Sequence, residues 1–324
     1  MSDSNVAKIF SNSGDLKSLH TWVEGLRGRL IVHSETLDIT VSALLAGGHV
    51  LLEGPPGVGK TTLAKQLAHS LGCSFSRIQM TSDLLPSEIV GGLIPAPGSQ
   101  GFEFKRGPIF SQIVLADELN RSSPKTQSAL LEAMAEATVS VDGVTHELPK
   151  PFFVIATQNP GESHGVFPLA ESQLDRFMVH ASLDYPDQPK ELEVLKSEIS
   201  KSTRGPSTST HALKPGELLQ FQRLAQSAHI EESVFQYIHQ LVLALRTNTG
   251  LSGSLSTRAL IQLSRVSQGH ACLMGRDYVL PTDVEKMAPF TLGHRIFSGE
   301  QNSQTLPENR EKVIQCLATV SKPK

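Results

Sequence analysis

Cysteine is scarce in this sequence, and its few cysteines stand far apart. The 324 residues include three, Cys73, Cys272 and Cys316. Their odd number excludes a complete disulfide framework, and none has the C-x-x-C spacing of a zinc or iron–sulfur site. We therefore expect free thiols and a reducing, cytoplasmic compartment.

Aromatic residues and long hydrophobic runs are also scarce. Aromatic side chains make up 5% of the chain, with Trp22 as its one tryptophan, and the formal net charge is −3. These values argue against a base-stacking surface and against a strong positive field for nucleic acid. The longest apolar stretch, 39–52, is interrupted by polar residues and glycines and is shorter than the roughly 20 residues that span a bilayer. We expect neither a membrane-spanning helix nor a signal peptide.

The composition that remains is that of a folded globular chain. Hydrophobic residues make up 39% of it and charged residues 19%, and its length suits two domains. Short apolar segments alternate with helical patterns, which predicts a parallel sheet covered by helices on both faces. The predicted strands are 49–53, 73–80, 113–116, 152–157 and 177–183.

Two segments interrupt this alternation, and the pattern changes after the fifth predicted strand. The interruptions are 81–108 and 138–148, and the second has a hairpin pattern with Asp142-Gly143 at its turn. After the prolines of 185–190 the pattern becomes helical, with predicted helices at 215–228, 231–247, 256–274 and 281–290. We expect a lead-in at 1–25, an α/β domain at 26–187 and an all-helical domain at 188–324.

The strongest motif is GPPGVGKT, which follows a predicted strand and opens a predicted helix. It matches the phosphate-binding pattern G-x-x-x-x-G-K-[ST] in the context that this pattern requires. Backbone N–H groups and the helix N-terminus attract phosphates, Lys60 is expected to reach the β- and γ-phosphates, and the Thr61 hydroxyl is expected to bind Mg²⁺. The predicted nucleotide-binding residues are Gly54, Pro55, Pro56, Gly57, Val58, Gly59, Lys60, Thr61 and Thr62.

A second motif, IVLADELN, ends an apolar strand in two acids. Asp117 suits a carboxylate associated with Mg²⁺, and Glu118 suits a base that polarises the attacking water. Neighbouring residues of a strand point to opposite sides, but both can serve one site where the chain turns. The alternative is a pair of solvated acids, which the nearby phosphate loop disfavours.

Three further polar residues stand where they could complete a nucleotide site. Asn159 directly follows a predicted strand and could orient water, although an Asn before Pro160 also forms turns. Arg176 could stabilise a transferring phosphoryl group, although spacing alone favours a surface ion pair, for which Asp175 is the obvious partner in the same motif. Arg258 lies in the first turn of a predicted helix, where a cation is unfavourable for the helix dipole, and this position suggests another role. The alternative is a solvated arginine.

Together these motifs resemble those of AAA+ ATPases and, more narrowly, of the MoxR family. The segments that carry the resemblance are ALLAGGHVLLEGPPGVGKT, GPIFSQIVLADELNRSSPKTQSALLEAM and ATQNPGESHGVFPLAESQLDRF, followed by STRAL, GRDYVLPTDV and GHRI, about residues 26–300 in all. The resemblance implies that Asn159 is sensor 1, Arg176 an arginine finger acting in trans, and Arg258 sensor 2. It also implies that 81–108 is a helix-2 insert and 138–148 a pre-sensor-1 hairpin. His33-Ser34 departs from the Gly-Gln of the family, so the residues around the adenine stay open.

The family resemblance implies an ATP- and Mg²⁺-dependent hydrolase that forms a ring, with a hexamer expected, and remodels or matures a partner protein. A protein with a von Willebrand factor A domain is an implied partner. One alternative is a nucleic-acid-associated AAA+ motor, but Lys105 and Arg106 are the only basic residues of 81–108, and 138–148 has none. A small-molecule P-loop kinase is a second alternative, which would need a substrate pocket in place of Arg176, Arg258 and a helical lid.

Overall fold

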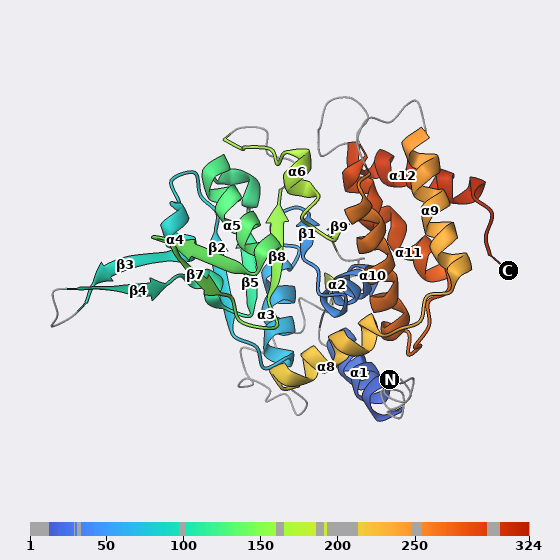
Figure 1. Ribbon diagram of the computed structural model, residues 1–324, viewed down its shortest axis with the longest axis horizontal. Helices are drawn as coiled ribbons and strands as arrows, with labels where there is room; N and C mark the ends of the chain where they lie inside the picture. The colour runs from blue at the N-terminus through green and yellow to red at the C-terminus, as the bar shows by residue number, and fades with distance from the viewer. Residues whose placement is uncertain are drawn as a thin grey trace.

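The computed structural model describes residues 13–28, 30, 34–96, 101–159, 165–185, 191–192, 213–247, 255–296 and 305–323. Within these ranges, an α/β part built on a parallel sheet is followed by a group of helices, and Figure 1 shows the two parts side by side. The fold class predicted from the alternation of strands and helices is therefore confirmed.

A five-stranded parallel sheet forms the centre of the α/β part. Its strand order is β2-β5-β8-β1-β9, and every neighbouring pair is parallel. Parallel strands end at one edge of a sheet, so the polar residues that follow β1, β5 and β8 come to the same edge. The five strands match those predicted to within two residues: β1 (Val50–Glu53), β2 (Phe75–Gln79), β5 (Ile113–Asp117), β8 (Phe153–Gln158) and β9 (Val179–Ser182).

Alternate residues of the strands belong to two separate apolar cores, one on each face of the sheet. In β5, for example, Ile113 and Leu115 belong to the larger core, whereas Val114 and Ala116 belong to the second. The larger core includes side chains of α2 (Ser34–Leu45) and α3 (Lys60–Ser70), and the second those of α4 (Pro86–Val90) and α5 (Pro124–Glu136). The strands are buried on both faces, which is why they are nearly continuous apolar runs in the sequence.

Two hairpins fill the interruptions that the sequence shows. They are β3 (Gly91–Pro95) with β4 (Phe102–Arg106), and β6 (Thr138–Val141) with β7 (Val144–Glu147). Asp142 and Gly143 both have positive φ, as a two-residue hairpin turn requires. The ring of Phe104 stacks on that of His146 with 4.0 Å between centroids, so the hairpins contact each other. In Figure 1 the β3–β4 hairpin extends away from the sheet on the side opposite the later helices.

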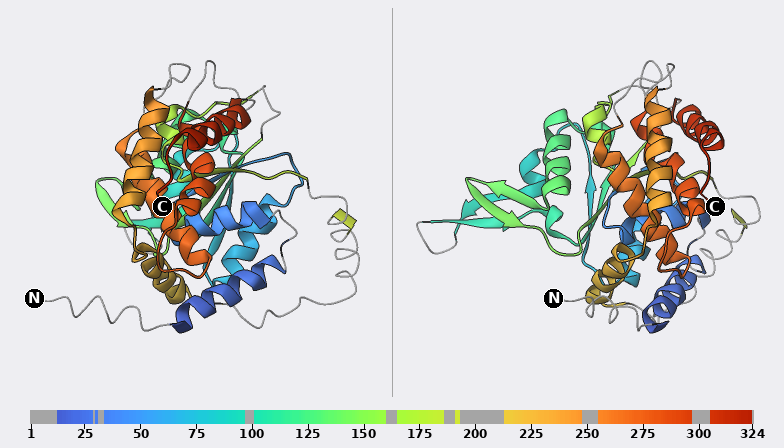
Figure 2. Two further views of the ribbon diagram at one scale, coloured as in Figure 1. Left: turned by 90° about the vertical axis from the view of Figure 1, so that its right-hand side faces the viewer. Right: turned by 45° about the vertical axis from the view of Figure 1, so that its right-hand side comes forward.

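The later helices pack against the α/β part through α10 and α2. Gly269 of α10 makes this contact close, because a Cβ there would lie 2.2 Å from the Ser42 carbonyl oxygen of α2. The right-hand view of Figure 2 shows the orange and red helices among them grouped on one side of the sheet. The helices are α8 (Pro215–Gln226), α9 (Glu232–Thr247), α10 (Thr257–Leu273), α11 (Pro281–Leu292) and α12 (Thr305–Thr319).

The first described helix, α1 (Ser13–Arg27), differs from the expected lead-in. Its Leu19, Trp22, Val23 and Leu26 are buried and follow the helical spacing i, i+3, i+4, i+7, a stripe that the polar residues between them obscure. The Trp22 indole N–H donates to the Ser70 hydroxyl at 3.1 Å. Residues 13–25 are therefore an ordered part of the core, and residues 1–12 lie outside the described ranges.

The last helix, α12, was not predicted. Its Arg310 donates to the Ser182 hydroxyl at 2.9 Å and to the His180 carbonyl oxygen at 2.8 Å, so the end of the chain is attached to β9. The expected loop at 201–215 falls mostly outside the described ranges. Among the helices that the structure describes, none is long and apolar enough to cross a membrane.

Candidate active site

The predicted phosphate loop lies between β1 and α3, at the edge where the parallel strands end. Gly57 and Gly59 have φ of 87° and 95°, which L side chains rarely adopt, and a Cβ on either would meet no neighbouring atom within 4 Å. Gly54 is required for another reason, because a Cβ there would lie 2.2 Å from the Leu183 carbonyl oxygen. The loop is thus anchored at its start and open around its middle glycines.

Lys60 begins α3 and folds back over this loop. Its side chain is buried, and its Nζ donates to the Gly54 carbonyl oxygen at 2.7 Å. Thr61 follows in the first turn of the helix and is half-buried. A cation at the N-terminus of a helix, beside a loop rich in glycine, is suited to bind phosphate groups.

Asp117 ends β5 and is held by two neighbouring strands. Its Oδ1 accepts a hydrogen bond of 2.6 Å from the Thr157 hydroxyl of β8, and its Oδ2 accepts one of 3.0 Å from Arg77 Nε of β2. The carboxylate is buried, and these bonds fix its orientation. Neither Thr157 nor Arg77 was singled out from the sequence.

Glu118 turns toward the same edge because its backbone is left-handed, with φ of 59° and ψ of 49°. Its N–H donates to the Thr157 hydroxyl at 2.9 Å, and its Oε2 accepts from Gln79 Nε2 at 2.9 Å and from Arg121 at 3.2 Å. Thr157 therefore contacts both acids of the motif. The chain turns at Glu118, directly after the end of β5. This turn allows the adjacent acids Asp117 and Glu118 to face the same site.

The side chains at this edge have the chemistry to bind phosphate groups together with a divalent cation. The described residues contain no cluster of three or more His, Cys, Asp or Glu side chains that could hold a metal ion. A cation that takes few protein ligands fits this donor set, since Mg²⁺ is bound by one or two carboxylates together with water and phosphate oxygens. The Thr61 hydroxyl and the Asp117 carboxylate are the side chains that would hold it.

Of the other predicted site residues, only Asn159 lies at this edge. Arg176 and Arg258 lie near the start of β9, whose first residue pairs with the first residue of β1. Asn159 directly follows β8. Arg176 lies between α6 (Glu171–Leu174) and β9, half-buried, and its Nη1 donates to the Leu131 carbonyl oxygen of α5 at 3.2 Å. The alternative of a surface ion pair between Arg176 and Asp175 is wrong in this structure, because Asp175 pairs with other arginines.

Arg258 is in the first turn of α10, after Ser256, which occupies the N-cap position without a side-chain capping bond. Its Nη1 lies 3.5 Å from Asp175 Oδ2. Arg295, which follows α11, donates through Nε to Asp175 Oδ1 at 2.9 Å. One carboxylate of the α/β part thus contacts two guanidinium groups of the helical part.

Sequence reasoning missed four residues of this arrangement and paired a fifth, Asp175, with the wrong arginine. Signals for them existed: the alternation of polar residues in β2, the hydroxyl just before Asn159, and the GHRI segment near the chain end. No local pattern reveals their partners, because the contacts join different elements. The four missed residues are Arg77, Gln79, Thr157 and Arg295.

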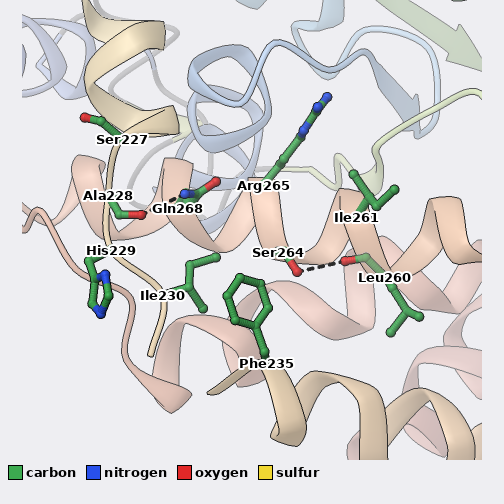
Figure 3. A pocket seen from close by; sticks show the side chains of 10 residues that line it. All are labelled: Ser227, Ala228, His229, Ile230, Phe235, Leu260, Ile261, Ser264, Arg265 and Gln268. Carbon is green, nitrogen blue, oxygen red and sulfur yellow. Dashed lines mark hydrogen bonds between the residues drawn. The ribbon is translucent and has the colours of Figure 1, made fainter. Parts of the chain in front are cut away.

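A separate groove of about 510 Å³ lies on the helical part. Figure 3 shows the side chains that line it, which come from α10, from the segment between α8 and α9, and from the first turn of α9. Gln268 closes one end by donating to the Ala228 carbonyl oxygen at 2.7 Å. None of the predicted site residues lines this groove.

Comparisons with known proteins agree with the motifs and the fold. The ATPase family associated with various cellular activities (AAA) matches residues 49–179, and the AAA lid domain matches residues 243–315. A protein of Cytophaga hutchinsonii, assigned as an ATPase and solved by crystallography, has a TM-score of 0.85 and 35% identity, over 98% of this chain and 99% of that one.

Curated relatives cover most of the chain. The uncharacterized protein YeaC of Bacillus subtilis is 44% identical over 85% of each chain. Chaperone MoxR1 of Mycobacterium tuberculosis is 38% identical over 83% of this chain and 73% of its own length. Protein MoxR of Paracoccus denitrificans is 28% identical over 91% of each. With an AAA domain followed by an AAA lid domain, and with these relatives along most of its length, the chain belongs to the MoxR-type AAA+ ATPases.

Proposed function

We propose that this protein is a Mg²⁺-dependent ATPase that works in a ring and uses ATP hydrolysis to remodel or mature a partner protein. One observation carries the proposal: Asp117 and Glu118 both contact Thr157, at the edge of the sheet where Gly54 begins the phosphate loop. That arrangement suits the binding of a triphosphate and the activation of a water molecule beside it.

Each residue of the edge has a proposed part in binding. Residues 54–62 bind the phosphates through backbone N–H groups, and Lys60 exchanges the Gly54 carbonyl for phosphate oxygens. Thr61 and Asp117 would hold Mg²⁺, whose charge offsets that of the phosphates. The buried, doubly hydrogen-bonded Asp117 carboxylate supports this part, because its orientation is determined before any ligand binds.

The proposed catalytic base is Glu118, assisted by Asn159, which orients the attacking water. The left-handed backbone of Glu118 supports this role, since strain at a non-glycine residue is retained where the surrounding structure enforces it. Gln79 and Arg121 bond the same Oε2 atom, which leaves Oε1 as the oxygen proposed to accept the proton from water.

Arg176 and Arg258 are proposed to stabilise the charge of the phosphates. Arg176 lies next to β9, an edge strand of the sheet, which supports action on a neighbouring subunit in a ring. A hexamer is the ring size that the family resemblance suggests. Arg258 is proposed as sensor 2.

The partner is proposed to be a client protein, with a von Willebrand factor A domain protein as a further candidate from the family resemblance. The hairpins β3–β4 and β6–β7 support a surface for a client, because Phe102 and Val144 are 69% and 57% exposed there. The three cysteines are free in the structure, which supports the proposed cytoplasmic location.

The test compares Lys60→Ala with the matched control Lys65→Ala on the exposed side of the same helix. We expect Lys60→Ala to lower ATP affinity by about 10- to 100-fold, since a charged hydrogen bond to phosphate is lost. Lys65→Ala should bind and hydrolyse ATP like the unchanged protein. Thermal unfolding of both variants reports whether the fold is retained.

Hydrolysis by the unchanged protein should require added Mg²⁺ and stop with a chelator. Equal ATP affinity in all three proteins would contradict the assignment of the phosphate loop. Failure of the unchanged protein to hydrolyse ATP under conditions where its mass shows a ring would contradict the proposed activity.

A further inference from the structure

Asp175 lies between two arginines of the helical part and directly before a third. Its Oδ1 is 2.9 Å from Arg295 Nε, and its Oδ2 is 3.5 Å from Arg258 Nη1. The next residue, Arg176, directs its guanidinium instead to the Leu131 carbonyl oxygen. A single carboxylate is therefore shared by two cations from another part of the chain.

The two arginines are held very differently. The side chain of Arg295 is 3% exposed, and it also donates to the Phe177 carbonyl oxygen at 2.6 Å and to Gln262 Oε1 and the Thr291 carbonyl oxygen. It is therefore an anchored partner. The side chain of Arg258 is 53% exposed, and within the described ranges its one ion pair is the long contact with Asp175.

This asymmetry makes Arg258 the partner that can leave. Burial lowers the pKa of Arg295, and the adjacent Asp175 carboxylate opposes that effect, which means that Asp175 stabilises the charged form of Arg295. The charge of Asp175 is thus already partly neutralised when Arg258 approaches it. A triphosphate carries several negative charges, so it attracts the same guanidinium more strongly than a shared carboxylate does.

We propose that Asp175 is a positioning residue that holds Arg258 away from the nucleotide until a triphosphate draws it off. The inference rests on the proposed function, in which Arg258 contacts the phosphates. Asp175 then competes with the γ-phosphate for Arg258. This competition lowers the affinity for ATP below the value that the phosphate contacts alone would give. ADP lacks the γ-phosphate, so the ion pair between Arg258 and Asp175 persists when ADP is bound.

The test measures the affinity of the full chain for ADP and for a non-hydrolysable ATP analogue in the presence of Mg²⁺. Asp175→Asn keeps an oxygen for Arg295 Nε but removes the charge that attracts Arg258. We expect the analogue to bind about two- to fivefold more tightly, the range expected for an exposed ion pair, and ADP to bind as before. The matched control is Glu171→Gln, an exposed acid of α6, which should change neither affinity.

A double-variant cycle separates competition from a structural effect. In an Arg258→Ala background, Asp175→Asn should no longer change the affinity for the analogue, because the arginine in question is absent. Arg265→Ala, on the same helix, is the control for Arg258→Ala and should preserve the response to Asp175→Asn. A structural defect would instead weaken the binding of both nucleotides in every background.

The variant could lose stability because Arg295 would keep a buried charge. A second pair, Asp175→Asn with Arg295→Met, removes both charges and avoids an unpaired buried cation. The double variant should bind the analogue more tightly than Arg295→Met alone, by the same factor that separates Asp175→Asn from the unchanged protein.

The outcomes distinguish the inference from the function on which it rests. No nucleotide binding by the unchanged protein overturns both. If nucleotide binding depends on Lys60 but the Asp175→Asn variant binds the analogue with unchanged or lower affinity, the inference is overturned and the proposed function stays intact. Tighter analogue binding that persists in the Arg258→Ala background also overturns it.

Discussion

The Thr157 hydroxyl donates a hydrogen bond of 2.6 Å to Oδ1 of Asp117, so a residue of β8 holds the carboxylate at the end of β5. The same oxygen accepts the N–H of Glu118 at 2.9 Å. Thr157 is fully buried. One hydroxyl therefore fixes both the carboxylate proposed to hold Mg²⁺ and the backbone of the proposed base.

Thr157→Val should test this arrangement, because valine retains the shape and lacks the hydroxyl. We expect ATP turnover to fall about 10- to 100-fold, as it does when partners of metal ligands are removed. The free energy of unfolding should fall by about 1–3 kcal/mol, since Asp117 and the Glu118 N–H lose a buried partner. Thr157→Ser should recover most of the turnover, and a Thr157→Val protein with normal turnover would contradict the assigned role.

Asp117 and Glu118 should be distinguishable by substitution. Glu118→Gln should bind ATP normally and hydrolyse it about 10²- to 10⁴-fold more slowly, because it loses a general base. Asp117→Asn should instead weaken ATP binding and alter its Mg²⁺ dependence. Measurements of affinity and turnover across a Mg²⁺ titration compare the two, with Glu136→Gln on α5 as the exposed control.

Identical behaviour of the two variants in both measurements would show that the roles are divided wrongly. The unchanged binding expected of Glu118→Gln also makes it the variant with which to retain ATP and a client together. Proteins that co-purify with it and are absent from Lys60→Ala preparations are candidate clients.

Arg176→Ala should bind ATP and lose about 10³-fold or more of its turnover if it acts as an arginine finger. Action in trans can be tested by mixing Arg176→Ala subunits with Lys60→Ala subunits, each inactive alone. A site with an intact phosphate loop then faces a neighbour with an intact Arg176, and partial activity should return. The recovery should rise with protein concentration as rings form.

Arg223→Ala, an exposed arginine of α8, is the control and should be active by itself. The mixture needs evidence that rings contain both subunits, for example from native mass spectrometry of differently tagged chains. Mixed rings without recovered turnover would indicate that Arg176 acts within its own subunit or is structural.

His49 should make stability depend on pH. Its ring is buried, accepts the Val154 N–H through Nδ1 at 3.0 Å, and donates from Nε2 to the Met134 carbonyl oxygen at 3.1 Å. Burial lowers the pKa of His49 from 6.5 to about 4, so the folded protein keeps this ring neutral. The unfolded chain takes up the proton near pH 6.5, and the free energy of unfolding should therefore fall between pH 6.5 and pH 4, by at most about 3 kcal/mol from this group.

Denaturant unfolding of the unchanged protein and of His49→Gln at several pH values would measure this contribution. The variant should be less stable at pH 7.5, and the difference should shrink as the pH falls toward 4. Burial also lowers the pKa of His180 and of His294, so some acid sensitivity should persist in the variant. An unchanged difference at all pH values would contradict the role given to His49.

The sheet and the phosphate loop were predictable because each depends on a short stretch of chain. Strands buried on both faces need continuous apolar runs, and residues 113–117 contain one. Positive φ at Gly57 and Gly59 excludes most side chains, so the loop has a recognisable pattern. The helix α1 was missed because its apolar stripe is diluted by polar residues that face solvent.

The sequence by itself determined the class of fold and predicted the phosphate loop and the two acids of the proposed site, because backbone conformation and burial constrain residues that are near one another in the chain. Only the tertiary structure decided which side chains hold them: Thr157 is 40 residues from Asp117, and Arg295 is 120 residues from Asp175. Such pairs are formed by strand order and by the packing of the helical part on the sheet. A hydroxyl or a guanidinium looks the same in a sequence whether it is solvated or buried against a carboxylate, so its role is set by the neighbours that folding brings to it.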